Sequence, residues 1–214
     1  MFELTVTWAI IIVTVVVSFS AFNNHAIMGD LIFHPPAITH RNQWYRFLTC
    51  GLIHADIPHL AFNMLALYMF GDFVEQAFVA IFNEMGKPIY LLMYLLALVV
   101  SLLPTYLRQM HNVHYHSLGA SGAVSAVIFA GIFLIPTVKI GFLLIPPFMP
   151  GFVFGPLYLI LSAYLQKKGR DDINHSAHIW GAVFGIVFLI VACYGFSHFD
   201  PIKRFVSEIQ SFFQ

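Results

Sequence analysis

Residues 176–196 read SAHIWGAVFGIVFLIVACYGF and contain no Asp, Glu, Lys or Arg. An apolar run of this length matches the thickness of the hydrocarbon core of a membrane. Five further apolar runs precede it, at residues 4–22, 58–82, 88–107, 117–136 and 151–165. Lipid offers no hydrogen-bond partners to the backbone, so each run is expected to form a helix. The predicted fold is an all-α polytopic membrane protein, with one domain over residues 1–214 and six transmembrane helices.

Composition agrees with lipid as the main solvent. The chain is 59% hydrophobic and only 9% charged, which is too little charge to cover a soluble domain. Ten basic and ten acidic residues cancel, so we expect no nucleic-acid-binding surface. The first run has no basic residue before it and is longer than the apolar part of a secretory signal, so we expect it to be retained as a span.

Polar motifs begin the second, fourth and sixth runs. With six spans, the even-numbered helices all begin on the same side of the membrane. The motifs should therefore lie on one face at similar depth, although they are far apart in the sequence. They are His59 with Asn63, Gly119-Ala120-Ser121-Gly122, and Ala177-His178.

Ser121 and His178 have the chemistry of a nucleophile and a general base. Ser121 falls in the opening turn of a helix, where unpaired backbone N–H groups and the helix dipole favour an anion. An imidazole titrates near neutral pH and transfers a proton in both directions. Gly181 and Gly185 form a GxxxG pattern, which permits close contact between helices in lipid. The fourth run offers a matching stripe of small residues at Gly122, Ala126 and Ala130.

His59 and Asn63 lie four residues apart, on one face of a helix, and both donate hydrogen bonds. They are candidates for an oxyanion hole. The sixth run has no Asp or Glu before His178, so a Ser–His dyad is favoured over a triad. Each residue also has a structural reading, because helical serines usually bond their own backbone and GxxxG alone usually means packing. Four polar residues at matched depth in a membrane favour function.

Other polar residues carry weaker signals. His111, His114 and His116 suit a solvated loop better than a metal site, and we expect no metal. Asp72 and Glu75 are expected to be anchors at the membrane boundary.

These motifs together resemble the rhomboid family of intramembrane proteases. Residues 119–122 resemble its GxSG, residues 177–181 its AHxxG, and residues 59–63 its HxxxN, while residues 44–46 resemble its tryptophan–arginine motif. His54 and Glu75 also fall at familiar positions. The likeness runs from about residue 44 to residue 185.

The resemblance implies a six-helix rhomboid-like bundle around a polar cavity. It makes Ser121 the nucleophile and His178 the general base, with Gly119 part of the motif. His59, Asn63 and the Ser121 amide would hold the oxyanion. It further implies that residues 44–46 lie partly in the membrane, that the fifth helix acts as a gate and residues 167–175 as a cap, and that no cofactor is needed.

Three features depart from the family pattern. Some members carry a tyrosine four residues after the nucleophile, and its ring stacks on the histidine; here that residue is Ser125. What positions His178 stays open, with Trp180 or its neighbours as candidates. Tyr45 directly precedes Arg46, where the family has tryptophan. The family orientation, with the N-terminus in the cytoplasm, leaves six basic residues outside and four inside, against the positive-inside rule.

The predicted function is an intramembrane serine endopeptidase that hydrolyses membrane-protein substrates in or near their transmembrane segments. The expected partners are transmembrane proteins and the lipid bilayer, and the expected location is the bacterial inner (plasma) membrane. The oligomeric state is left open. Two alternatives remain: a non-proteolytic rhomboid-like protein that binds membrane segments, and a His-rich metal-binding transporter.

Overall fold

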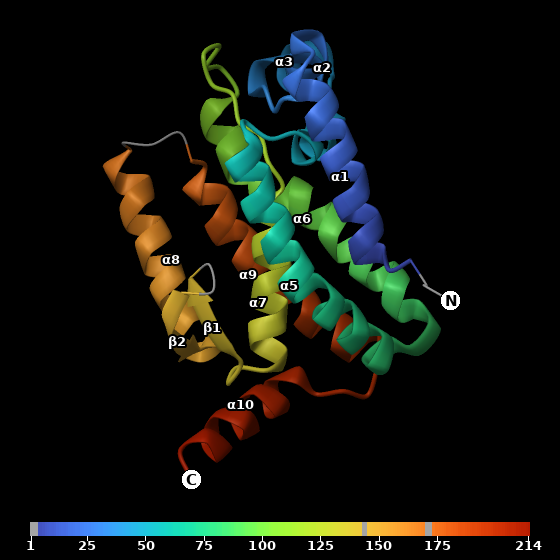
Figure 1. Cartoon of the computed structure of the whole chain (residues 1–214), viewed down its shortest axis with the longest axis vertical. Coiled ribbons are helices and arrows are strands. Elements are labelled where there is room, and N and C mark those ends of the chain that lie inside the picture. Colours follow the sequence, from blue (N-terminus) through green and yellow to red (C-terminus); the bar gives the residue numbers. More distant parts are fainter. Residues whose placement is uncertain (1–3, 143–144, 170–172) are drawn as a thin grey trace.

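A long helix occupies each of the six apolar runs in the computed structural model, which describes residues 4–142, 145–169 and 173–214 (Figure 1). Each helix begins and ends within four residues of its predicted bounds. The helices are α1 (Val6–Phe22), α5 (Ile57–Phe82), α6 (Gly86–Gln109), α7 (Ser121–Leu134), α8 (Gly151–Lys168) and α9 (His175–Phe196).

Length and composition mark only some of these helices as membrane spans by themselves. Within the described residues, two helical stretches are long and apolar enough, Ile57–Gln109 and His175–Phe196. The first combines α5 and α6 through the short 3-10 helix η2 (Asn83–Met85). Helices α1 and α7 are apolar but shorter. The count of six spans therefore stays a prediction.

Shorter elements fill the connections. The segment between α1 and α5 folds into α2 (His25–Leu31), α3 (Pro35–Arg41), α4 (Arg46–Thr49) and the 3-10 helix η1 (Cys50–Leu52). Between α7 and α8, strands β1 (Lys139–Phe142) and β2 (Ile145–Pro150) pair antiparallel, with Lys139 opposite Pro150. Helix α10 (Pro201–Phe212) follows α9.

Helix α7 lies at the centre of the bundle and α8 at its edge (Figure 1). Eleven of the fourteen residues of α7 are buried, and α7 contacts α5, α6 and α9. In α8, by contrast, the buried residues are Gly151, Gly155 and Ser162 out of eighteen. Thus α7, which carries Ser121, packs against other helices around most of its circumference, whereas α8 packs along one side.

Glu75 caps the first helix. Its side chain is 2% exposed, and its carboxylate accepts hydrogen bonds from the backbone N–H groups of Val6 (2.9 Å) and Thr7 (2.8 Å) and from the Thr7 hydroxyl (2.9 Å). Negative charge at a helix N-terminus is stabilising, since the first N–H groups have no partner within the helix. The predicted boundary anchor is therefore wrong for Glu75, which is a buried link between α5 and α1.

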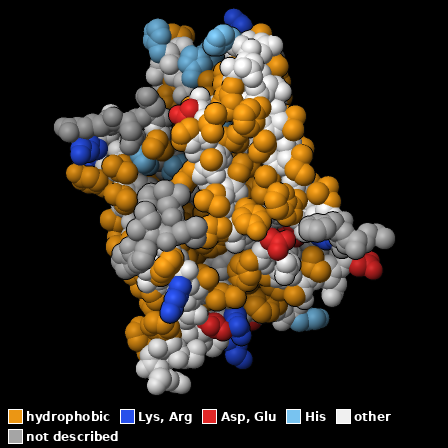
Figure 2. Space-filling view, viewed as in Figure 1, with side chains coloured by type: hydrophobic (Ala, Val, Ile, Leu, Met, Phe, Trp, Pro, Cys, Tyr) orange, Lys and Arg blue, Asp and Glu red, His pale blue; other side chains and the backbone are white. Residues whose placement is uncertain are grey.

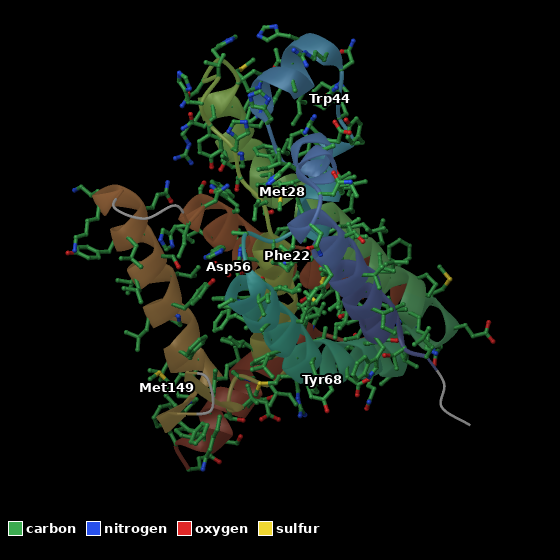
Figure 3. All side chains as sticks on the ribbon, turned by 45° about the horizontal axis from the view of Figure 1, so that its top comes forward. Phe22, Met28, Trp44, Asp56, Tyr68 and Met149 are labelled. Atoms are coloured by element: carbon green, nitrogen blue, oxygen red, sulfur yellow. The ribbon has the colours of Figure 1, made fainter. Side chains whose placement is uncertain are left out.

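The surface carries an apolar band. Figure 2 shows hydrophobic side chains over the middle of the bundle, with histidines and charged side chains gathered toward its ends. Val16 and Tyr68 are among the exposed apolar side chains. Trp44, at one end of the molecule in Figure 3, is 54% exposed, whereas Arg46 is buried and donates to the carbonyls of Gly29 (2.8 Å) and Ile32 (2.7 Å). Such a band suits a lipid environment.

Candidate active site

Small residues bring α7 and α9 into direct backbone contact. A Cβ added at Gly181 would overlap the carbonyl of Gly122, and one added at Gly185 would lie 2.7 Å from the Cα of Ala126. Side chains larger than hydrogen are therefore excluded at both positions of the GxxxG. The predicted packing of the two small-residue stripes is confirmed, and it places the beginnings of the two helices side by side.

Ser121 and His178 meet where these helices begin. The Nε2 atom of His178 lies 2.8 Å from the Ser121 Oγ, which is hydrogen-bonding distance. Ser121 is the first residue of α7, directly after Ala120 at the N-cap. A neutral imidazole that accepts from the Ser121 hydroxyl at Nε2 carries its proton on Nδ1. At this distance the imidazole could take the proton of the Ser121 hydroxyl.

Gly119 brings a third element to the site. Its φ of 107° lies in the region that favours glycine. An added Cβ would also lie 2.8 Å from Cε1 and 2.9 Å from Nε2 of His59. The Nε2 edge of the His59 ring thus faces the backbone just before Ser121. Parity of the spans predicted that these three motifs meet, and they do.

Hydrogen bonds assign the tautomer of His59. The backbone N–H of Ala55 donates to its Nδ1 at 3.5 Å, which leaves Nε2 to carry the proton. An Nε2–H group directed toward the start of α7 is a donor of the kind that an oxyanion needs. Asn63, one turn further along α5 and 3% exposed, donates one amide hydrogen to the carbonyl of His59 at 2.9 Å. Its second amide hydrogen leaves it one further hydrogen bond to donate.

His54 fixes the loop in front of the nucleophile. The backbone N–H of Ala120 donates to its Nε2 (3.4 Å), so Nδ1 donates to the Ser18 hydroxyl (3.0 Å), which in turn donates to the Leu52 carbonyl (2.9 Å). Burial lowers the pKa of His54 to about 3, so the ring is neutral at physiological pH. Sequence reasoning noted only that His54 falls at a familiar position.

Tyr158 of α8 supplies the ring that α7 lacks. Its ring centroid lies 6.3 Å from that of His178, with 25° between the planes, and its hydroxyl lies 3.2 Å from the Ser125 Oγ. His175 meets His178 edge-on at 5.7 Å. Trp180 is 45% exposed. The ring contacts to His178 come from Tyr158 and His175, and what positions His178 stays open at this point.

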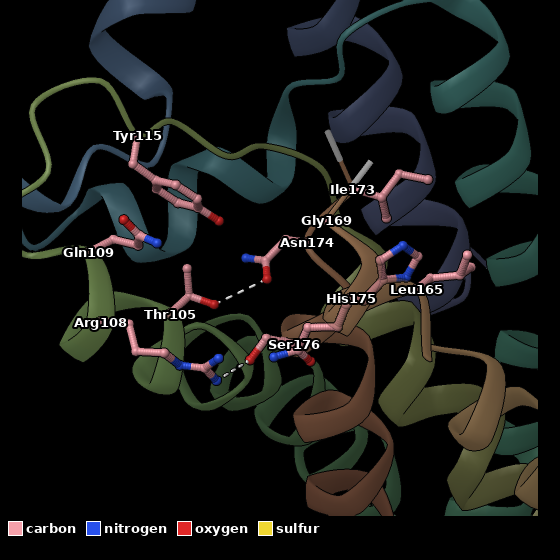
Figure 4. Close-up of a pocket in the computed structure, with 11 residues that line it drawn as sticks. Thr105, Arg108, Gln109, Tyr115, Leu165, Gly169, Ile173, Asn174, His175 and Ser176 are labelled. Carbon is pink, nitrogen blue, oxygen red and sulfur yellow. Dashed lines mark hydrogen bonds between the residues drawn. The ribbon is translucent and has the colours of Figure 1, made fainter. Parts of the chain in front are cut away.

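A cavity of about 470 Å³ adjoins the start of α9 (Figure 4). Its polar walls include Asn174, which accepts from Thr105 at 3.1 Å, and Ser176, which accepts from Arg108 at 2.9 Å. Asn174 also caps α9 by accepting from the backbone N–H of Ala177. The predicted cap at residues 167–175 borders this cavity, but its residues 170–172 lie outside the described part of the chain.

Four of the remaining histidines form two pairs outside the site. His34 stacks on His116 with 4.5 Å between ring centroids, and His40 lies 6.2 Å from His111. In the part of the chain that the structure describes, no group of three or more His, Cys, Asp or Glu side chains is arranged to hold a metal ion.

Fold and site together define a class: a helical integral membrane protein with a Ser–His pair at the meeting point of its helices. A family model named Rhomboid domain matches residues 41–195, and the chain belongs to the rhomboid family. The family assignment also makes it an integral, polytopic membrane protein.

Individual relatives are distant. The chain is 29% identical over 140 residues to the presenilin-associated rhomboid-like protein, mitochondrial, of Homo sapiens. The aligned region covers 64% of this chain and 35% of that protein. It is 25% identical over 147 residues to the putative rhomboid protease YdcA of Bacillus subtilis, covering 68% of this chain and 65% of that protein. It is 36% identical over 84 residues to the rhomboid protease GluP of Bacillus subtilis, covering 39% and 14%. The match thus spans about a third of the length of the mitochondrial relatives. Because the relatives include mitochondrial as well as bacterial proteins, a bacterial inner-membrane location stays a prediction.

Proposed function

We propose that this chain is an intramembrane serine endopeptidase that uses a Ser121–His178 dyad. The observation that carries the proposal is the 2.8 Å distance between His178 Nε2 and Ser121 Oγ. Because α7 and α9 are in backbone contact, this distance is set by the rigid centre of the bundle. Two relatives that are named rhomboid proteases support the same reading.

The reaction follows from the two protonation states of His178. As the Ser121 Oγ attacks the peptide carbonyl carbon, its proton moves to His178 Nε2 and a tetrahedral intermediate forms. The imidazolium then gives this proton to the leaving amine, the C–N bond breaks and an acyl-enzyme remains. Water, deprotonated by His178, attacks the acyl carbon and releases the carboxylic acid and Ser121.

Donors around the start of α7 would stabilise the oxyanion. The backbone N–H of Ser121 has no intrahelical partner because it opens the helix. His59 adds its Nε2–H group, and Asn63 adds its second amide hydrogen. Removal of one such donor typically costs about 10²-fold in turnover.

Transmembrane proteins are the substrate class that this site suits. The dyad lies within a bundle whose outer surface is apolar, so a substrate that shares the bilayer reaches it without leaving lipid. The polar cavity beside the start of α9 offers hydrogen-bonding groups to an unwound peptide. Substrate identity is open, and the expected partners are single-span proteins and the bilayer.

Purified protein should label with a fluorophosphonate probe and cleave members of a panel of single-span substrates. We expect Ser121→Ala to abolish both while leaving the melting temperature nearly unchanged, because one hydroxyl contributes little packing. Ser20→Ala, an exposed serine of α1, is the matched control. Cleavage by purified Ser121→Ala would remove Ser121 as the nucleophile. A folded wild-type chain that binds substrates but neither labels nor cleaves would identify the non-proteolytic alternative.

A further inference from the structure

The catalytic histidine is held by a ring from the helix at the edge of the bundle. Tyr158 and His178 are nearly parallel at 6.3 Å, a separation within the usual range for stacked aromatic pairs. On α7, the residue one turn after Ser121 is Ser125, whose hydroxymethyl group is too short to cover an imidazole. The stacking surface on His178 therefore comes from α8.

Four side chains hold Tyr158 in this position. Phe129 of α7 lies 5.6 Å from it, and Phe154, one turn earlier on α8, stacks on it at 6.0 Å. Its hydroxyl pairs with Ser125 at 3.2 Å and also with Ser162, which is buried on α8. A ring fixed at both its face and its hydroxyl limits rotation of the imidazole that it covers.

We propose that Tyr158 is a positioning residue that keeps His178 directed at Ser121, so that the dyad is complete only while α8 packs against α7 and α9. The Ser125–Tyr158 hydrogen bond joins α8 to the nucleophile helix, and the Tyr158–His178 stack joins α8 to the base helix. Since only three residues of α8 are buried, displacement of this helix would remove the ring without disturbing the α7–α9 contact. This inference rests on the proposed dyad.

The test compares Tyr158→Leu with Tyr164→Leu, the same change on the same helix at a side chain that is 58% exposed. We expect Tyr158→Leu to lower kcat by roughly 10- to 100-fold with little change in KM, because a misplaced catalytic group costs about that much. Fluorophosphonate labelling should slow in parallel, since a small probe reports Ser121 reactivity independently of substrate entry. Tyr164→Leu should behave as wild type. Tyr158→Phe, which keeps the ring, should retain most activity.

A relocated ring separates positioning from packing. In Ser125→Tyr/Tyr158→Leu the ring comes from α7, one turn after the nucleophile, and we expect it to restore much of the labelling rate. Recovery would support the inference even if Tyr158→Leu alone has a lower melting temperature. A folded Tyr158→Leu as reactive as wild type, or a folded double variant without recovery, would overturn the inference alone. A wild-type chain that neither labels nor cleaves would overturn the proposed function and this inference with it.

Discussion

Replacement of Gly181 by Ala tests whether the α7–α9 contact sets the geometry of the dyad. The new Cβ would overlap the Gly122 carbonyl oxygen and lie 2.8 Å from its carbonyl carbon, where ordinary contact begins at 3.4 Å. Backbone cannot rotate away as a flexible side chain can, so the helices must separate by roughly 1 Å. The gap between His178 Nε2 and Ser121 Oγ, now 2.8 Å, would widen to about 3.8 Å, beyond hydrogen-bonding distance.

Such a displacement should lower the rate by about 10²-fold and the stability by roughly 1–3 kcal/mol, the usual cost of overpacking. The assay is cleavage of a single-span substrate in liposomes, with fluorophosphonate labelling and a melting curve in detergent. Gly195→Ala on the same helix is the matched control, because nothing lies within 4 Å of its new Cβ. A Gly181→Ala protein that cleaves at a rate close to the wild-type rate would refute the reasoning, because the dyad would then tolerate a change in helix spacing.

Three further predictions address the Glu75 cap of α1, the His34–His116 pair and the proposed oxyanion hole. Glu75→Gln should destabilise the fold by about 2 kcal/mol, because a buried carboxylate that accepts three hydrogen bonds becomes an amide. The measurement is its melting temperature, with Asp72→Asn as the control. Equal melting temperatures of the two variants would contradict a capping role for Glu75. Partial burial and, second, the nearby charge of His116 lower the pKa of His34 below its usual 6.5, so the unfolded chain binds the proton more tightly. The contribution of His34 to the free energy of unfolding should be complete above about pH 6.5 and decline as the pH falls below this value. Between pH 7.5 and pH 5, the melting temperature of His34→Gln should therefore drop less than that of the wild type. An identical drop would exclude His34 as a source of the pH dependence. Asn63→Ala should lower kcat about 10²-fold at unchanged KM in steady-state kinetics, whereas a raised KM at constant kcat would make Asn63 a substrate contact.

Helix positions were predictable because lipid leaves the backbone no other regular structure and charged residues mark where each apolar run ends. Convergence of Ser121, His178 and His59 followed from the same counting, since even-numbered helices begin on one side. GxxxG supplied the close approach that brings two of these side chains into contact. The sequence was therefore sufficient to predict the helix positions and the meeting of the three motifs.

Contacts that depend on the rotation of a helix were not predictable in this way. Glu75 looks like a boundary residue from its place near a helix end, and only its burial against α1 reveals a cap. Tyr158 lies in an apolar run where an aromatic residue usually means packing, so its role depends on which side of α8 faces α9. The apolar spacing of Ile202, Phe205 and Ile209 was a readable signal for α10 that sequence reasoning did not use.

Because few residues of α8 are buried, the surrounding lipid can affect the position of this helix. Tyr158 lies seven residues after Gly151, about 10 Å along the helix axis, so a tilt of about 10° at the beginning of α8 would move the ring by nearly 2 Å. Helix α8 carries exposed Leu157, Ile160 and Leu161, which would contact the hydrocarbon if α8 spans the membrane as predicted. Helices adjust their tilt to hydrocarbon thickness. The thickness of the host membrane would thereby change the reactivity of Ser121, as a property of the solvent changes the reactivity of a dissolved catalyst. Cleavage rates measured in thin micelles and in thick bilayers would then differ because the tilt of α8 differs.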